Sequence, residues 1–280
     1  MKRTTFVIIA SFMVLAVVYP VYGQADEQIR VSGASTMFPF VAEILELHKE
    51  IHGVEFEIAA GGSGTGINNT ISGASDIGMA SRSISDSEKL QVEDLLVGLD
   101  TIVFVVNERN PINEISQAQL KEMYSQENVT WERFGWTNTP IVLVSKEIGR
   151  ATLDLFEDFA GIKSPYREQQ ETPKILESAI EVGANLEVAT IVGGIPNAIG
   201  YLSLGTAVEL QERGMPIKIL RLEGVEATTD NIVNGSYPIL RELNVVYRAD
   251  NEAKVQSLLE LLLSDQGQEI IEKHSFIPVN

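Results

Sequence analysis

The sequence contains no cysteine, which excludes disulfide bonds, thiolate-bound zinc, iron–sulfur clusters and thiol catalysis. Histidine is almost as scarce. Of the three histidines, His48 and His52 stand four residues apart but lack the glutamate of the zinc-protease motif. We therefore expect both to be solvated on a helix, and we predict no metal site and no cofactor. Long hydrophobic runs are missing beyond the N-terminus, so no later segment is expected to span a bilayer.

Basic residues are also in short supply. The 280 residues include 21 Lys and Arg against 39 Asp and Glu, which gives a formal net charge of −18 at pH 7. So acidic a chain is a poor partner for nucleic acid and for anionic membranes. A composition of 44% hydrophobic and 21% charged residues is that of a globular protein with one large or two medium domains.

The first 23 residues have the pattern of an export signal. Lys2 and Arg3 precede an apolar stretch at 6–19, and Gly23 is a small residue at the predicted cleavage point. The alternative is an uncleaved N-terminal anchor, for which the apolar stretch is short. We predict an exported protein, in a periplasm or at the cell surface.

Three segments share one order of elements: a strand, a loop of small polar residues, and a helix. The loops are "ASTMFP" at 34–39, "GGSGTG" at 61–66 and "KEIGRAT" at 146–152. Helix N-termini carry unpaired N–H groups and the positive end of the helix dipole, so each is suited to an anion. Ligands of α/β proteins bind at the carboxyl ends of strands. The sequence therefore favours an α/β protein that binds a small anion.

The spacing of apolar residues predicts individual helices. Val41, Ile44 and Leu45 lie on one helix face, with His48 at the same spacing. A short helix is expected to follow the glycine-rich loop, beginning at Ile67. The C-terminal stretch predicts an amphipathic helix or helix pair whose leucines face the core.

The glycine-rich segment does not match the glycine-rich motifs of enzymes. A P-loop requires Lys and then Ser or Thr after the last glycine, where Ile67 and Asn68 stand. The dinucleotide-binding motif would need glycine at 67, and the hydrolase GxSxG motif would need it in place of Thr65. No serine has an evident histidine partner in the sequence, and pairing in space stays open.

Six motifs, in order along the chain after Ile29, resemble the phosphate-binding proteins of high-affinity phosphate ABC transporters. They are "GASTMFPFVAEI", "GGSGTGI", "SDIGMASRSIS", "NVTWERF", "IPNAIGYLSLG" and "NIVNGSYPILREL". The resemblance implies an α/β, two-domain, type II periplasmic-binding-protein fold with the ligand cleft between the domains. It also implies a monomeric, non-enzymatic receptor that captures inorganic phosphate and delivers it to ABC transporter permease subunits in the membrane.

The first two loops follow the family closely. On the first, the resemblance implies three ligands: the Thr36 side chain and the backbone N–H groups of Met37 and Phe38. Met37 replaces the hydroxyl residue of some members, so only its backbone would contribute. On the second loop, Ser63 corresponds to the serine that binds phosphate through its hydroxyl and its N–H.

The third motif departs from the family at one position. Ser81 stands where some members have an aspartate that accepts the proton of phosphate, and Arg82 follows as in the shorter members. Both are implied ligands, and a salt bridge at the surface or between domains is the alternative for Arg82. A serine hydroxyl can accept from phosphate but can also donate to sulfate. We therefore expect weaker discrimination against sulfate, unless Asp76 or Glu147 supplies a carboxylate.

The third loop departs most, because the family usually reads Arg, two residues, then Gly-Ser-Gly-Thr. Lys146 replaces the arginine and Arg150 the serine, while Gly149 matches. The resemblance implies four phosphate ligands here: Lys146, Arg150, Ala151 through its backbone, and Thr152. Arginine suits bidentate contacts, and the alternative is that Arg150 points to solvent.

We expect the mature chain to cross twice between its two domains. Domain I is predicted at 26–105 plus 244–280 and domain II at 106–243, after the signal peptide or anchor at 1–23. Three other functions stay open. The protein could bind another tetrahedral oxyanion such as sulfate, molybdate or tungstate. It could be a secreted phosphatase or esterase that uses a loop serine, or a signalling or adhesion protein of the same fold.

Overall fold

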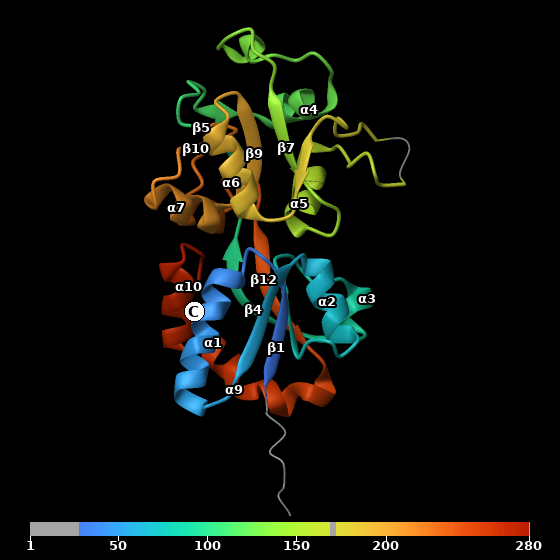
Figure 1. Ribbon diagram of the computed structural model, residues 1–280, viewed down its shortest axis with the longest axis vertical. Helices are drawn as coiled ribbons and strands as arrows, with labels where there is room; N and C mark the ends of the chain where they lie inside the picture. Colours follow the sequence, from blue (N-terminus) through green and yellow to red (C-terminus); the bar gives the residue numbers. More distant parts are fainter. Residues whose placement is uncertain (1–27, 169–171, 280) are drawn as a thin grey trace, which may run out of the picture.

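The computed structural model describes residues 28–168 and 172–279, which form two lobes, one above the other in Figure 1. Each lobe is built around a five-stranded sheet, and extended segments connect the two. The predicted signal peptide or anchor at 1–23 lies outside the described residues. Within them, no helix is both long and apolar enough to cross a membrane.

The lower lobe is a mixed sheet with helices on both faces. Its strand order is β2 (Phe56–Gly61), β1 (Ile29–Ala34), β3 (Ile77–Ala80), β12 (Arg241–Tyr247) and β4 (Glu93–Asp100). β1 is parallel to β2 and β3, and β12 is antiparallel to β3 and β4. The helices of one face are α1 (Phe38–His52), α9 (Glu252–Leu263) and α10 (Asp265–Lys273), while α2 (Ser63–Ile71) packs on the other and the short α3 (Asp86–Lys89) follows β3.

The upper lobe is a second mixed sheet. Its strand order is β10 (Ile217–Ile219), β5 (Ile102–Asn107), β9 (Ala198–Ser203), β7 (Val142–Lys146) and β8 (Ile180–Val182). Its helices are α4 (Gln117–Ser125), α5 (Ala151–Ala160), α6 (Asn185–Gly194), α7 (Leu204–Glu212) and α8 (Thr229–Val233). Smaller elements are the pair β6 (Glu114–Ile115) and β11 (Arg221–Leu222), and 3₁₀ helices at Trp131–Phe134 and Ala249–Asn251.

Two central strands form the core of the upper lobe. Every residue of β5 and of β9 is buried, as expected for strands that are covered on both faces. Aromatic rings fill the space between β9, α4 and α5: Phe156 stacks on Tyr201 with centroids 4.2 Å apart, and Tyr124 meets Phe156 edge-on at 4.7 Å. This rigid core fixes the start of α5 at the end of β7.

The chain passes between the lobes at two adjacent places. It leaves the lower sheet after Asp100 and enters the upper sheet at Ile102, and it returns at Arg241. Thr101 ties the two crossings together, because its hydroxyl donates to the carbonyl of Ile239 at 2.6 Å. All of β5 lies in the upper sheet, and the predicted limit at 105 falls within this strand. The domain limits at 105 and 244 stay a prediction.

Helix α1 buries the predicted face, but one expectation about it is wrong. Val41, Ile44 and Leu45 are buried as predicted, and so is His48, which was expected to be solvated. The reason is that α9 packs on this face, where the Nε2 atom of His48 lies 2.8 Å from the hydroxyl of Ser257. Burial, and then the neighbouring His52, lower the pKa of His48. A tertiary contact therefore takes the place of solvent.

Helix α2 begins earlier than expected. It starts at Ser63 with Gly62 as N-cap, so the glycine-rich segment forms the first helical turn. Gly66 explains why glycine is required inside this turn. A Cβ there would lie 2.8 Å from the Cα of Gly33, the carbonyl oxygen of Met79 and the carbonyl oxygen of Ser32. Only glycine lets α2 approach β1 and β3 so closely, and this approach places Ser63 at the edge of the sheet.

Candidate functional site

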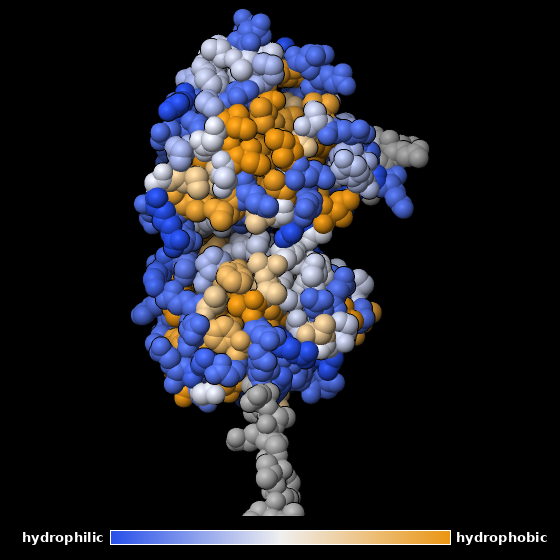
Figure 2. Space-filling view, in the orientation of Figure 1, coloured by the Kyte–Doolittle hydropathy of each residue, from blue (hydrophilic) through white to orange (hydrophobic). Residues whose placement is uncertain are grey.

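The three predicted loops meet between the lobes, where Figure 2 shows the molecule narrowed to a waist. The starts of α1 and α2 come from the lower lobe, and the start of α5 comes from the upper lobe. They enclose a small cavity of about 10 Å³. Its lining residues are Ala34, Ser35, Thr36, Gly61, Gly62, Ser63, Ser81, Arg150, Ala151, Thr152, Gly183 and Asn185.

Four hydroxyl side chains, which we call the hydroxyl ring, surround this cavity. Thr36, Ser63, Ser81 and Thr152 are each at most 4% exposed. Ser63 and Thr152 lie in the first turns of α2 and α5, where backbone N–H groups have no partner within the helix. Ser63 Oγ also accepts a hydrogen bond from the Ser81 N–H at 3.0 Å. The ring combines buried O–H groups with the positive ends of helix dipoles.

Arg241 lies directly against the ring and was missed by the sequence reasoning. Its side chain is 0% exposed and donates to the hydroxyls of Thr36, Ser81 and Thr152 at 3.2–3.5 Å. It forms a salt bridge with Asp100, whose side chain is 1% exposed. A signal was present in the sequence, because an arginine amid the apolar residues of "YPILREL" predicts a buried cation that needs a partner.

Asn185 is a second missed residue. It is the first residue of α6, it is 4% exposed, and its Nδ2 donates to Thr36 Oγ1 at 3.1 Å and to Thr206 Oγ1 at 3.3 Å. The contact with Thr36 joins the upper lobe to the lower. Nothing in the local sequence separates Asn185 from an ordinary polar residue at a helix start.

Arg150 also connects the lobes. It is the N-cap of α5, and its Nη1 donates to the carbonyl of Gly61, the last residue of β2. Its Nη2 contacts Glu147 Oε2 at 3.2 Å, so Glu147 is occupied by this ion pair. The side chain of Arg150 is 22% exposed and faces the cavity rather than bulk solvent.

The sequence model of a protein family, the PBP superfamily domain, matches residues 20–266. The chain belongs to this superfamily. It is 25% identical over 278 residues to the phosphate-binding protein PstS of Borreliella burgdorferi, with 98% of each chain covered. It is 24% identical to PstS of Bacillus subtilis, over 91% of this chain and 82% of that protein.

Solved structures of PBP proteins agree with this assignment. A phosphate ABC transporter substrate-binding protein from Clostridium perfringens, solved with bound phosphate, has a TM-score of 0.81 and 29% identity and covers 90% of this chain and 100% of its own. A phosphate transport receptor from Vibrio cholerae has a TM-score of 0.70 at 23% identity, over 89% of this chain and 99% of its own. The predicted type II periplasmic-binding-protein fold and the family resemblance are confirmed.

Not every predicted ligand of this PBP protein lines the cavity. The guanidinium of Arg82 donates to both carboxylate oxygens of Glu88, at 2.8 and 2.7 Å, and its role as a ligand stays a prediction. Glu88 also accepts from the backbone of Ser85 as the capping partner of α3. The N–H of Met37 donates to the carbonyl of Ala34, and neither Met37 nor Phe38 lines the cavity.

Lys146 lies behind the cavity rather than in its wall. Its side chain is 1% exposed, and Nζ donates to the carbonyl of Ala184 at 2.7 Å. Burial, and then the charges of Arg150 and Arg241, lower its pKa to about 7, against the opposing effects of Glu187 and Glu147. A direct ligand role for Lys146 stays a prediction. The ammonium of Lys146 lies close enough to the guanidinium groups of Arg150 and Arg241 for their charges to affect its pKa.

Of the two carboxylates that could have supplied an acceptor near Ser81, Glu147 pairs with Arg150 and Asp76 lies elsewhere. Asp76 stands before β3 and accepts from the backbone N–H of Arg30 at 2.8 Å and pairs with Lys254 at 2.9 Å. These contacts lie at the opposite end of β1 from the cavity, because Arg30 begins that strand and Thr36 follows its end. The buried carboxylate next to the hydroxyl ring is that of Asp100.

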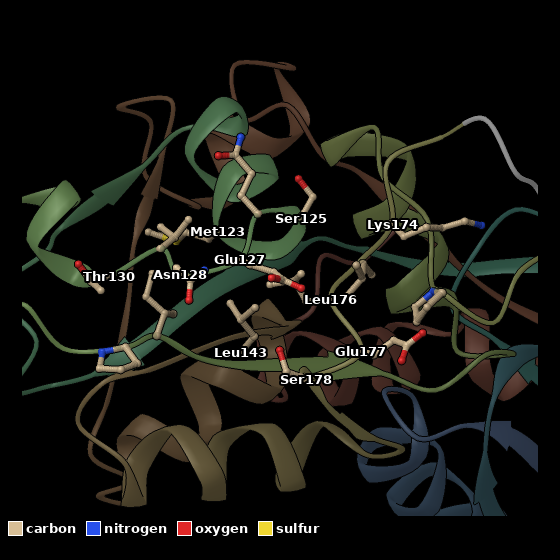
Figure 3. A pocket seen from close by; sticks show the side chains of 16 residues that line it. Met123, Ser125, Glu127, Asn128, Thr130, Leu143, Lys174, Leu176, Glu177 and Ser178 are labelled. Atoms are coloured by element: carbon tan, nitrogen blue, oxygen red, sulfur yellow. The ribbon is translucent and has the colours of Figure 1, made fainter.

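A much larger cavity, of about 890 Å³, lies in the upper lobe between the end of α4 and the segment 174–178 (Figure 3). Apolar side chains such as Met123, Leu143 and Leu176 line it together with exposed polar ones. Its charged residues, Glu127, Lys174 and Glu177, are not buried. Lacking a desolvated charge, this hollow is a weaker candidate for an anion than the hydroxyl ring. Among the described residues, no cluster of three or more His, Asp and Glu side chains could hold a metal ion.

Proposed function

We propose that this protein is the extracytoplasmic receptor of an ABC importer for inorganic phosphate. The observation that carries the proposal is the hydroxyl ring, which is buried between the lobes, adjoins Arg241 and lies at the starts of α1, α2 and α5. Relatives named as phosphate-binding proteins and a phosphate-bound neighbour support phosphate as the anion.

The net charge of −18 does not oppose this function. Total charge governs the rate at which an anion approaches, and salt screens that repulsion. Affinity is decided by local donors in a desolvated site, where hydrogen bonds to a charged group are about twice as strong as neutral ones. The ring supplies hydroxyls and backbone N–H groups, and Arg241 and Lys146 lie directly behind it.

We also propose that the protein is not an enzyme. A nucleophilic serine needs an adjacent base, usually histidine. Within the described residues, His48 contacts Ser257 and His274 contacts Glu43, while His52 is exposed. In the part of the chain that the structure describes, none of these histidines hydrogen-bonds a serine of the ring, and Ser63 instead accepts a backbone hydrogen bond from Ser81.

Calorimetric titration of the exported protein with phosphate and with sulfate tests the proposed function. We expect one phosphate per chain, tighter binding of phosphate than of sulfate, and no turnover of a phosphate monoester. Sulfate or molybdate binding in the absence of phosphate binding would favour the other oxyanions. Metal-independent ester turnover that disappears in Ser63→Ala would favour the phosphatase instead.

The position of Lys146 predicts a pH dependence of binding. The pKa of Lys146 is lowered to about 7, and a bound anion favours the charged ammonium. Binding therefore requires proton uptake once the pH exceeds that pKa, and affinity falls as pH rises. In Lys146→Arg the side chain stays charged, so the variant loses this part of the slope.

Titrations from about pH 6 to about pH 9, in buffers of different ionisation enthalpy, measure this proton uptake. Phosphate itself titrates in the same range and contributes equally to both proteins, so the difference between them isolates Lys146. Identical slopes for wild type and Lys146→Arg would show that this ammonium is not coupled to the ligand.

A further inference from the structure

Arg241 and Asp100 stand at the point where the chain passes between the lobes. Arg241 is the first residue of β12 and Asp100 the last residue of β4, and they are direct neighbours in the register of the sheet. Nε of Arg241 donates to Asp100 Oδ2 at 3.0 Å, and Nη2 donates to the same oxygen. Ser203 of the upper lobe donates to this oxygen at 2.7 Å. Asp100 therefore fixes the orientation of the guanidinium.

The remaining N–H groups of the guanidinium point at the hydroxyl ring. Nη1 donates to Thr152 Oγ1 at 3.2 Å and to Ser81 Oγ at 3.5 Å, and Nη2 donates to Thr36 Oγ1 at 3.4 Å. A guanidinium has no acceptor, so in each of these contacts the hydroxyl must accept. The proton of each hydroxyl must then point elsewhere.

Thr36 shows the consequence most clearly. A hydroxyl oxygen has two lone pairs and one proton. Both lone pairs of Thr36 are used, one by Arg241 Nη2 and one by Asn185 Nδ2 at 3.1 Å. Only its proton is left to offer to a ligand. Ser63 Oγ accepts from the Ser81 N–H at 3.0 Å and also lies 3.4 Å from Ser81 Oγ, where either hydroxyl can donate. One proton of this pair is used within the ring, and the other is left to offer to a ligand.

We propose that Arg241, held by Asp100 and assisted by Asn185, turns the hydroxyl ring into a set of hydrogen-bond donors. Arg241 is then a positioning residue that determines specificity, and it acts on the ligand through Thr36, Ser81 and Thr152. A ring of donors suits oxygens that carry no proton. It binds the oxygens of sulfate and the unprotonated oxygens of phosphate equally well and offers little to a P–O–H group, so we expect the preference for phosphate over sulfate to be small.

This inference rests on the proposed phosphate-binding function and explains how selectivity would be set. Selectivity for phosphate over sulfate requires an acceptor for the ligand's proton. Removing the N–H groups that point at the ring frees lone pairs on the hydroxyls, which can then accept that proton. Loss of these donors should weaken both anions but sulfate more.

The main test compares wild type with the double variant Arg241→Met plus Asp100→Asn. Removing both charges together avoids leaving a buried carboxylate without its partner, which would destabilise the fold. We expect both affinities to fall roughly tenfold or more, and the ratio of phosphate to sulfate affinity to rise roughly threefold or more. Affinities are measured by calorimetry at fixed ionic strength and pH.

Asn185→Ala is the second variant, because it frees one lone pair of Thr36 without touching the buried ion pair. It should raise the same ratio. Arg221→Gln is the matched control, since its guanidinium pairs with Glu114 away from the cavity, and it should leave both affinities and the ratio unchanged. Thermal unfolding checks that each variant is folded.

An unchanged or lowered ratio in Asn185→Ala, or in the double variant if it folds, would overturn the inference while phosphate binding by the wild type stands. Failure of the wild type to bind phosphate would instead overturn the proposed function. The two failures are therefore distinguishable from the same set of titrations.

Discussion

Gly62→Ala is expected to weaken phosphate binding roughly ten- to a hundredfold, because the lobes can no longer close. A Cβ at Gly62 would lie 2.3 Å from the carbonyl oxygen of Gly149 and 3.1 Å from its carbonyl carbon, on the facing loop of the upper lobe. These are backbone atoms and cannot swing aside. Overpacking of this kind costs about 1–3 kcal/mol.

The backbone of Gly62 makes this variant informative. Its φ of −102° and ψ of 163° are open to any residue, so the lower lobe should fold normally with alanine. The substitution should therefore weaken closure of the two lobes and leave the stability of the lower lobe unchanged. Calorimetry gives the affinity, and small-angle scattering shows whether phosphate still compacts the molecule.

Gly64→Ala is the matched control for Gly62. It lies in the same helical turn, but its Cβ would meet the Gly149 carbonyl oxygen at 3.9 Å, an ordinary contact. This variant should bind phosphate and compact like the wild type. If Gly62→Ala also did so, the two loops would not touch in the liganded protein.

The second large effect is expected at Arg150. Arg150→Ala removes the donor to the Gly61 carbonyl and a cation beside the cavity. Charge-assisted bonds in a desolvated site are worth about 2–5 kcal/mol when truncated, so affinity should fall by roughly two orders of magnitude. Arg150 also lowers the pKa of Lys146, so this pKa should rise in the variant. The affinity of the variant should then begin to fall at a higher pH than that of the wild type.

Glu147→Gln separates the two contacts of Arg150. The Glu147 side chain is 52% exposed, and exposed ion pairs are worth about 1 kcal/mol or less. This substitution should therefore change phosphate affinity little. Full affinity in Arg150→Ala would mean that the guanidinium neither connects the lobes nor contacts the anion in solution.

Local pattern was sufficient to predict much of the fold. The apolar face of α1, the C-terminal helix pair and the three anion-suited loops follow from spacing and from the chemistry of helix starts. These features depend on residues that are close in sequence, which is why one sequence reveals them. The two-domain fold was available only through the family resemblance.

The errors share a physical cause, which is contact between distant parts of the chain. Arg241 meets Ser81 and Thr36 from 160 and 205 residues away, so the local sequence can indicate a buried cation but not what it contacts. His48 is covered by α9 through Ser257, 209 residues away. The ion pair of Arg82 with Glu88 is local by contrast, because its partners are only six residues apart.

The position of the cavity between the lobes has a consequence for the timing of transport. Contacts from Arg150 to Gly61, from Asn185 to Thr36 and from Arg241 to Thr152 all cross between the lobes. We expect a captured anion to leave when these contacts separate and the lobes open. The lifetime of the complex is then the waiting time for the lobes to open, however tightly each oxygen is held. A permease that pulled the lobes apart would shorten that wait without touching the ligand.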